Sequence, residues 1–347
     1  MNVHRVLQSH GLPHADAFLG MDAVGFDAIT VVAKLTWSVK ASGACRLHDE
    51  ARAIRMSDLY RRGAASSLER ATDRVPYKPG TDVFVSAHAL PPPGHESDHL
   101  DVGLRLETGQ RTLEKQLRVF GRRVFMQGVR QVVPGPAEPL SEPVPLIYEL
   151  AAGGRDPGHA DHVDHLNPVG VGHRRNPAEL VGQEAHRIEC LGGTHPAGLG
   201  PIPRHWAPRS AWFGTTDAAY YRERHPVAPE DFDPRHYTAA HPDLWSPEPL
   251  RGDEPMRLTG MTPEGVWSFR LPHYAPRFIA VVDGEEQALD THLDTIFIDL
   301  EDLHDRVVEL CWRVSVKLPS KSERLESITI TDETPVPRAW YVEEEHA

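Results

Sequence analysis

The feature that most constrains the fold is a strict alternation of apolar and polar residues in several short segments. Across residues 29–39 the apolar side chains stand at every second position, from Ile29 to Val39, and Lys34 and Thr36 lie on the opposite face. Successive side chains of a β-strand point to opposite faces, so this alternation predicts a half-buried strand. Residues 100–106 and 307–317 repeat the pattern.

Further segments carry weaker strand signals, and helical signals are few. The other predicted strands cover residues 82–90, 117–125, 145–151, 256–259, 266–271, 278–282 and 291–300. Short helices are predicted only over 57–70 and 217–225, where Asp217 could cap the first turn. We therefore predict a mainly β protein, an antiparallel sandwich or two packed β-sandwich units, with few short helices and long ordered loops rich in proline and aromatic residues.

Proline divides the chain into regions. Thirteen prolines lie between Pro196 and Pro272, too many for continuous helix or interior strand, yet the same stretch is rich in Trp, Tyr and Phe. Disordered segments are poor in aromatic residues, so this region should be ordered. We predict an N-terminal β-rich unit over 1–150, an excursion packed on the sheets over 151–255, a C-terminal β-rich unit over 256–320 and a polar tail over 321–347.

Charge and cysteine content narrow the class of protein. The 347 residues include no run of about 20 apolar residues, which a membrane span needs, and the first residues lack the apolar core of a signal peptide. Cys45, Cys190 and Cys311 form no paired or zinc-binding pattern, which favours a reducing compartment. The formal charge of −13 argues against nucleic acid as a partner. We expect a cytoplasmic protein that binds neither membrane nor nucleic acid.

One histidine-rich run could hold a metal ion. His159, His162 and His165 stand three apart, with Asp161 and Asp164 between them, and zinc accepts both ligand types. The spacing differs from the helical HExxH motif, so we interpret the run as a charge-balanced loop and expect no metal or other cofactor. A metal-dependent hydrolase that uses this run is the alternative. No phosphate-binding loop or nucleophile elbow occurs elsewhere, so we do not expect an enzyme.

The central region contains residues typical of protein-binding surfaces. Arg204 and Arg209 flank Trp206, with Trp212 following, and Arg and Trp are enriched at binding hot spots. The same residue types also form buried ion pairs under loops, and both interpretations stay open. Asp231 and Asp233 surround Phe232 in a sequence typical of a turn.

An ordered set of short motifs resembles a known bacterial family. The motifs cover residues 145–154, 167–172, 200–209, 214–217, 229–233, 250–254, 269–272, 294–299 and 310–313, and the resemblance extends to 26–37 and 117–125. Together they resemble the domain-of-unknown-function family number twenty-one sixty-nine, which is encoded beside type VI secretion genes. This chain departs from the family at Leu150, where an arginine is expected, and at Thr216, where a tyrosine is expected.

The resemblance implies an adaptor or chaperone. Such a protein holds a toxin effector and helps to load it onto the spike of the secretion machine, through the valine-glycine-repeat trimer or its PAAR tip. With the Arg/Trp region, the resemblance implies a protein-binding surface that includes Tyr148, Glu149, Arg204, Trp206, Arg209, Trp212, Asp217, Asp231 and Asp233.

Overall fold

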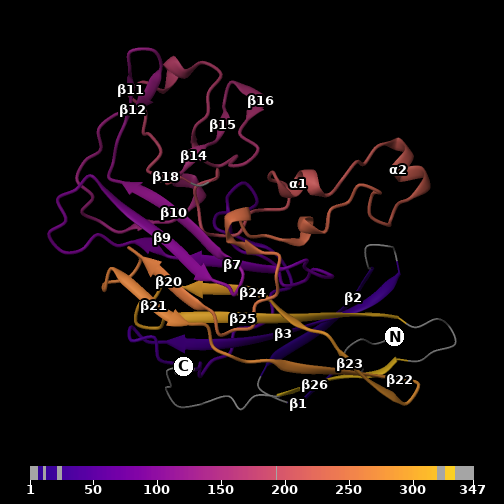
Figure 1. Cartoon of the computed structure of the whole chain (residues 1–347). Helices are drawn as coiled ribbons and strands as arrows, with labels where there is room; N and C mark the ends of the chain where they lie inside the picture. The colour runs from indigo at the N-terminus through magenta and orange to yellow at the C-terminus, as the bar shows by residue number, and fades with distance from the viewer. Residues whose placement is uncertain (1–6, 11–12, 22–25, 193, 319–324, 333–347) are drawn as a thin grey trace.

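The computed structural model describes residues 7–10, 13–21, 26–192, 194–318 and 325–332 of the chain (Figure 1). Three large sheets and five two-stranded ones account for the strands of these residues. Two short helices, α1 (Arg209–Trp212) and α2 (Ala218–Glu223), are the α-helices of the described chain. The prediction of a mainly β protein with few short helices is confirmed. No described helix has the length and apolar character needed to cross a bilayer.

The largest sheet has seven strands. Its order is β19 (Trp245–Ser246), β7 (Thr81–Ser86), β24 (His292–Asp299), β25 (Val307–Lys317), β3 (Asp27–Val39) and β2 (His14–Met21), and β4 (Cys45–Leu47) pairs with β3. Strand β25 pairs antiparallel with β3, from Val307 opposite Ser38 to Lys317 opposite Ala28. Strands β7 and β24 run parallel, and the other pairs of this sheet are antiparallel, so the sheet is mixed but mostly antiparallel. Strand β2 is the last strand on its side of this sheet.

Two smaller sheets complete the main body. The five-stranded sheet is antiparallel, in the order β18 (Ile188–Cys190), β10 (Thr112–Phe120), β9 (His99–Glu107), β20 (Pro255–Thr259) and β21 (Val266–Arg270). The four-stranded sheet has the order β1 (Leu7–His10), β26 (Leu325–Asp332), β22 (Pro276–Val282) and β23 (Glu285–Leu289), with β1 parallel to β26. Each sheet therefore combines strands that are distant in the sequence.

The remaining pairs and turns belong to the connections. The short pairs are β5 (Leu59–Tyr60) with β6 (Leu68–Arg70), β8 (His88–Ala89) with β13 (Val144–Pro145), β11 (Phe125–Gln127) with β12 (Val132–Pro134), β14 (Ala152–Gly153) with β17 (Val171–Gly172), and β15 (Arg155–Asp156) with β16 (His159–Val163). Single 3-10 turns are η2 (Tyr148–Leu150), η3 (Pro177–Leu180), η4 (Pro234–Tyr237) and η5 (Pro242–Leu244).

Three predictions of secondary structure are wrong. Residues 57–70, predicted as a helix, instead form the β5–β6 pair and the turn between them. Residues 145–151, predicted as a strand, contribute only Pro145 to β13 before the chain turns into η2. The polar tail expected from Lys321 contains strand β26, whose Ile328 and Ile330 are buried against the other sheets. The rest of that tail, 333–347, lies outside the described residues.

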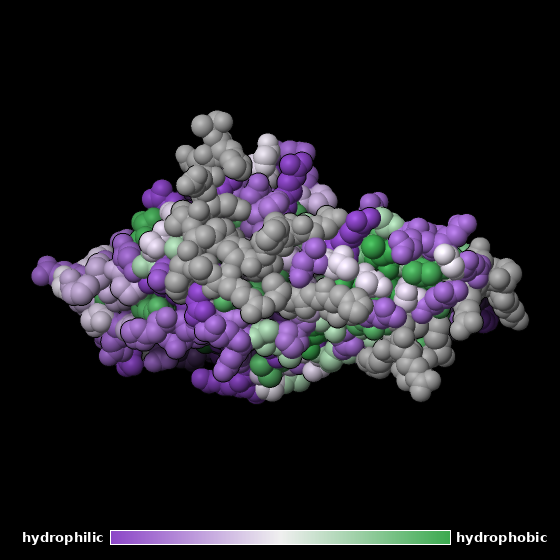
Figure 2. Space-filling model, turned by 90° about the horizontal axis from the view of Figure 1, so that it is seen from below, coloured by the Kyte–Doolittle hydropathy of each residue, from purple (hydrophilic) through white to green (hydrophobic). Residues whose placement is uncertain are grey.

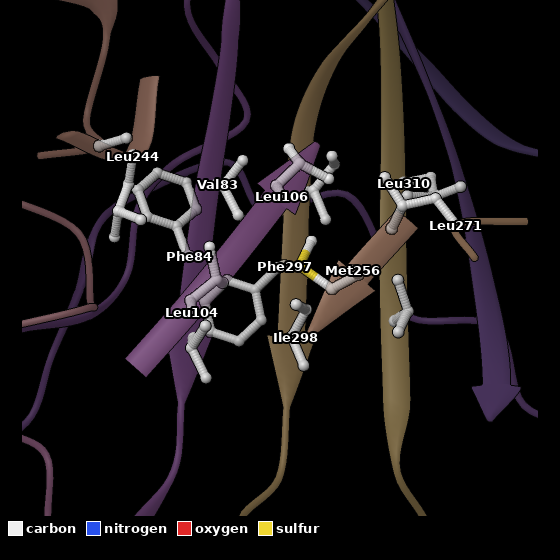
Figure 3. Packing of buried hydrophobic residues seen from close by; sticks show 14 of the residues in the cluster. Val83, Phe84, Leu104, Leu106, Leu244, Met256, Leu271, Phe297, Ile298 and Leu310 are labelled. Atoms are coloured by element: carbon white, nitrogen blue, oxygen red, sulfur yellow. The ribbon is translucent and has the colours of Figure 1, made fainter. Parts of the chain in front are cut away.

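The largest apolar cluster of the described residues lies between the sheets. Val83, Ile298 and Leu310 of the seven-stranded sheet face Leu104 and Met256 of the five-stranded sheet, whose strands cross over the larger sheet (Figure 3). The same cluster contains Phe278 and Ile330 of the four-stranded sheet, and Leu199 and Leu244 of the central excursion. Burial of apolar surface is worth roughly 25 cal/mol per Å², so this shared core is the main force that holds the sheets and the excursion together.

The other face of the seven-stranded sheet is polar but also buried. The predicted polar side of β3 includes Lys34, which is 4 % exposed and lies 2.6 Å from Asp73 and 3.3 Å from Glu309 of β25. Arg70 bonds to Glu309 at 2.8 Å and to Asp299 of β24. These ion pairs join the sheet to residues 53–78, which we call the covering segment.

Two more pairs extend this layer. Arg313 of β25 lies 2.7 Å from Asp294 and donates to the carbonyl oxygen of Asp73 at 2.8 Å. Lys78 lies 2.8 Å from Asp82, and both are buried. A charge in a protein interior is costly unless it is paired and hydrogen-bonded, so these ion pairs fix the position of the covering segment on the sheet.

A buried lysine fastens the excursion to the five-stranded sheet. Lys115 of β10 stands between Leu113 and Leu117 on the core face, and its ammonium donates to the carbonyl oxygen of Pro196 at 3.0 Å. Its nearest carboxylate, Asp243, is 3.8 Å away. Burial therefore lowers the pKa of Lys115 from 10.5 to about 8.

We expect Arg70→Met to lower the free energy of unfolding by about 3–5 kcal/mol, because it leaves Asp299 buried without its cation and Glu309 with Lys34 alone. Urea-induced unfolding followed by circular dichroism measures the change. The control is Arg105→Met on the exposed face of β9, which should alter stability by no more than about 0.5 kcal/mol. Equal shifts in the two variants would contradict the role of the buried layer.

We expect Lys115 to make the free energy of unfolding rise with pH in the alkaline range. Its pKa is lower in the folded chain, so between about 8 and 10.5 the unfolded chain binds more protons and alkaline pH favours folding. Relative to Lys115→Met, the wild type should therefore gain up to about 3 kcal/mol of stability across this range. Urea unfolding at a series of pH values checks this, and parallel profiles for the two proteins would refute it.

Candidate protein-binding surface

Two of the predicted site residues, Tyr148 and Trp206, form a buried platform beneath the excursion. The rings of Tyr148 and Trp206 meet edge to face with their centroids 5.5 Å apart, and Ile202 completes the cluster. The hydroxyl of Tyr148 donates to the carbonyl oxygen of Gly200 at 2.8 Å. Tyr148 is 2 % exposed and Trp206 is 1 % exposed. Both rings are therefore buried in the packing beneath the excursion and do not form part of an exposed binding surface.

Arg209 lies in the same region and is buried without a carboxylate partner among the described residues. Its guanidinium donates to the carbonyl oxygen of His236, at 3.1 Å from Nε and 3.0 Å from Nη2, and to that of Ile202. Burial, together with the nearby charge of Arg204, lowers the pKa of Arg209 to about 10. The side chain thus joins α1 to η4 and leaves a positive charge under the excursion.

The predicted acidic residues build turns at the outer end of the excursion. Asp217 caps α2 by accepting from the backbone N–H of Tyr220 at 2.8 Å, as predicted from the sequence. Asp231 accepts from the backbone N–H of Thr215 at 2.9 Å and from its hydroxyl at 2.7 Å. These bonds to Thr215 lower the pKa of Asp231.

Asp233 and Glu149 have structural partners too. Asp233 accepts from the backbone N–H of Arg235 at 2.9 Å and pairs with its side chain, which in turn lies 4.9 Å above the ring of Trp212. Glu149 accepts from the backbone N–H of Ser67 at 2.9 Å and from its hydroxyl. Glu149 therefore fastens η2 to the covering segment at Ser67.

A groove of about 540 Å³ opens where the excursion approaches the edge strand β2. Its walls are the end of β2 (residues 18–21), the covering segment, and residues 213–237 of the excursion. We call it the β2 groove. Apolar side chains dominate its lining, and the best exposed are Leu19 at 47 %, Met56 at 44 % and Phe213 at 37 %.

Aromatic rings of the excursion continue the apolar wall. Phe213, Phe232 and Tyr237 form a chain of ring contacts with centroids 5.4 to 6.2 Å apart. Seen from below, apolar residues also gather toward the end of the molecule at which β2, β22 and β23 lie (Figure 2). Exposed apolar surface of this kind marks sites of protein–protein contact in soluble proteins.

Of the predicted site residues, only Arg204 lines the β2 groove. Leu19, Met56 and Phe213 were not predicted, because an exposed apolar residue in a sequence looks the same as a core residue. The feature of the sequence that could have indicated this surface was the row of aromatic residues in the excursion. The sequence did not indicate that residues 18–21, almost two hundred positions away, would form the facing wall.

The histidine run does not converge on one point. Residues 159–163 form strand β16, not the predicted loop, so His159 and His162 project from opposite faces. His159 lies 3.3 Å from Asp156, and the ring of His162 stacks on that of His173 with centroids 4.2 Å apart. Asp164 pairs instead with His195 at 2.8 Å. Among the described residues, no group of three or more His, Cys, Asp or Glu side chains could hold a metal ion.

Comparison with known proteins gives one match. The model of a protein family described as "Uncharacterized protein conserved in bacteria (DUF2169)" matches residues 25–313. No curated protein and no solved structure matches the chain.

Truncation to alanine should lower the free energy of unfolding much more at a buried platform residue than at an exposed residue of the β2 groove. Trp206→Ala should cost about 3–5 kcal/mol of unfolding free energy because it empties a buried site. Met56→Ala, on the exposed wall of the groove, should change stability by no more than about 0.5 kcal/mol. Thermal and urea unfolding of both variants measure this, and a Met56 cost as large as that of Trp206 would show that the groove wall is part of the core.

Proposed function

The chain belongs to the bacterial family described as "Uncharacterized protein conserved in bacteria (DUF2169)", and from this membership we propose that it is an adaptor of type VI secretion. In this proposal it binds a toxin effector in the cytoplasm and helps to load it onto the spike, through the valine-glycine-repeat trimer or its PAAR tip. It acts by binding, without chemistry or a cofactor.

The observation that carries the proposal is the β2 groove. It exposes Leu19, Met56 and Phe213 at the surface, and its walls rest on the apolar core and on the buried charged layer. An adaptor needs such a site, in which rigid elements hold exposed apolar side chains ready for a partner. Because the walls are already ordered, a partner would not have to pay the entropy of ordering them.

The net charge of the chain and an interface of moderate size are both compatible with a partner that binds and is then released to the spike. A formal charge of −13 keeps the free protein soluble despite its exposed apolar groove. An interface of moderate size with a polar rim can be tight enough for capture and weak enough for transfer to the spike. The acidic surface would also repel like-charged copies of the chain and limit self-association.

Deleting the gene should abolish secretion of the toxin encoded beside it and lower the amount of soluble toxin, because an unescorted effector exposes its own apolar surface. Secreted and cytosolic toxin are measured by immunoblot, with the wild-type gene restored as the control. The adaptor should co-purify with the toxin from lysates and be absent from secreted spike complexes. Normal solubility and normal secretion of the toxin in the deletion strain would refute the proposal.

A further inference from the structure

The β2 groove contains two arginines that have no acidic partner. Arg74 and Arg204 both line it, and neither makes an ion pair with a described residue. The guanidinium of Arg74 lies 5.6 Å above the ring of Phe18, and the Nε atom of Arg204 is buried with no hydrogen-bond acceptor. A buried donor without an acceptor is costly, so the guanidinium of Arg204 has hydrogen-bonding capacity that the described residues do not use.

The surroundings of these arginines add to the positive field. Arg209 has only carbonyl oxygens as hydrogen-bond partners, and its charge acts on the same region as that of Arg204. The carboxylate that lines the groove, Asp58, already accepts from the backbone N–H of Thr72 at 2.8 Å. At the rim, Asp231 and Asp233 are bonded to Thr215 and Arg235. Among the charged residues that line the groove, two arginines outnumber Asp58, so the lining carries a net positive charge in a chain that is acidic overall.

The groove also lies beside an edge strand. It follows residues 18–21 of β2, the last strand of the seven-stranded sheet, which pairs with β3 on its other side. Edge strands can accept a further strand from a partner, through backbone hydrogen bonds, while alternate side chains enter flanking pockets. Leu19 and Phe213 supply apolar contacts, and the two arginines supply sites for carboxylates.

We propose that the β2 groove binds an extended segment of the effector in which apolar residues alternate with Asp or Glu. The apolar side chains pack against Leu19, Met56 and Phe213, and the carboxylates pair with Arg74 and Arg204. This inference rests on the proposed adaptor function and names the chemistry that the effector presents to it. Charge-assisted bonds to arginine make the choice of an acidic segment specific.

Labelled peptides of about twelve residues test the inference directly, because a segment of that length can span a groove beside one strand. The first peptide alternates Leu with Glu, the second replaces every Glu with Lys, and the third replaces every Leu with Ser. Fluorescence anisotropy with the full chain should show binding of the first peptide about tenfold or more tighter than either control. Raising the salt from about 50 to about 500 mM should reduce the preference for Glu over Lys.

Variants of the chain test whether the peptides bind in the β2 groove. The double variant Arg74→Gln with Arg204→Gln should bring the Glu and Lys peptides to within about twofold of each other, because the charges that select Glu are gone. Met56→Asp should weaken binding of the first peptide about tenfold, since it places a carboxylate in the apolar wall. The matched control is Arg105→Gln with Arg257→Gln on the outer face of the five-stranded sheet, which should bind as the wild type does.

Several results would overturn the inference. These are equal affinity for the Glu and Lys peptides, full selectivity in the Arg74/Arg204 double variant, or loss of binding when residues 333–347 are removed, which would move recognition to the tail. A toxin that co-purifies equally well with the double variant would refute the groove while leaving the adaptor function in place. A toxin that fails to co-purify with the wild type would refute the adaptor function, whatever the peptides show.

Discussion

The ion pairs between β3, β25 and the covering segment are the interactions on which the rest of the structure depends. Lys34 and Arg70 meet at Glu309 and hold residues 53–78 against the polar face of the seven-stranded sheet. Burial alone would lower the pKa of Lys34, yet the acidic groups around it raise that pKa overall. The same segment forms one wall of the β2 groove. The charged layer fixes the position of the covering segment. It therefore also sets the width of the β2 groove, which is the surface proposed to bind a partner.

Alternation in the sequence predicted the strands well but could not tell what covers them. It located β3, β9 and β25, because a period of two follows from backbone geometry alone. It predicted Lys34 and Thr36 on a solvated face, but both are buried under the covering segment. In the sequence, a polar side chain that forms an ion pair with a distant residue looks the same as one that is hydrated at the surface. The partner, Asp73, lies in a segment that the sequence predicted to begin with a helix.

The same limit applies to the candidate surface. Trp206 and Tyr148 stood out as large residues typical of interfaces, but packing against Ile202 buries both of them. Asp217 was predicted as a helix cap because capping depends on residues three positions apart, and its bond to Tyr220 is local. The β2 groove depends on the approach of β2 to residues 213–237, which only the folded sheets determine. Local chemistry could be predicted from sequence, and the assembly of a surface from distant segments could not.

Net charge gave a similarly incomplete picture of possible partners. A formal charge of −13 suggests attraction to basic partners, but an average over the chain does not describe the field in one groove. Most acidic side chains near the β2 groove are already bonded, Asp231 to Thr215 and Asp233 to Arg235, whereas Arg74 and Arg204 are not paired. The charge of Asp233 is offset at short range by Arg235, and among the charged residues that line the groove itself the two arginines outnumber Asp58. The unpaired arginines therefore determine which segment the groove prefers, against the sign of the whole protein.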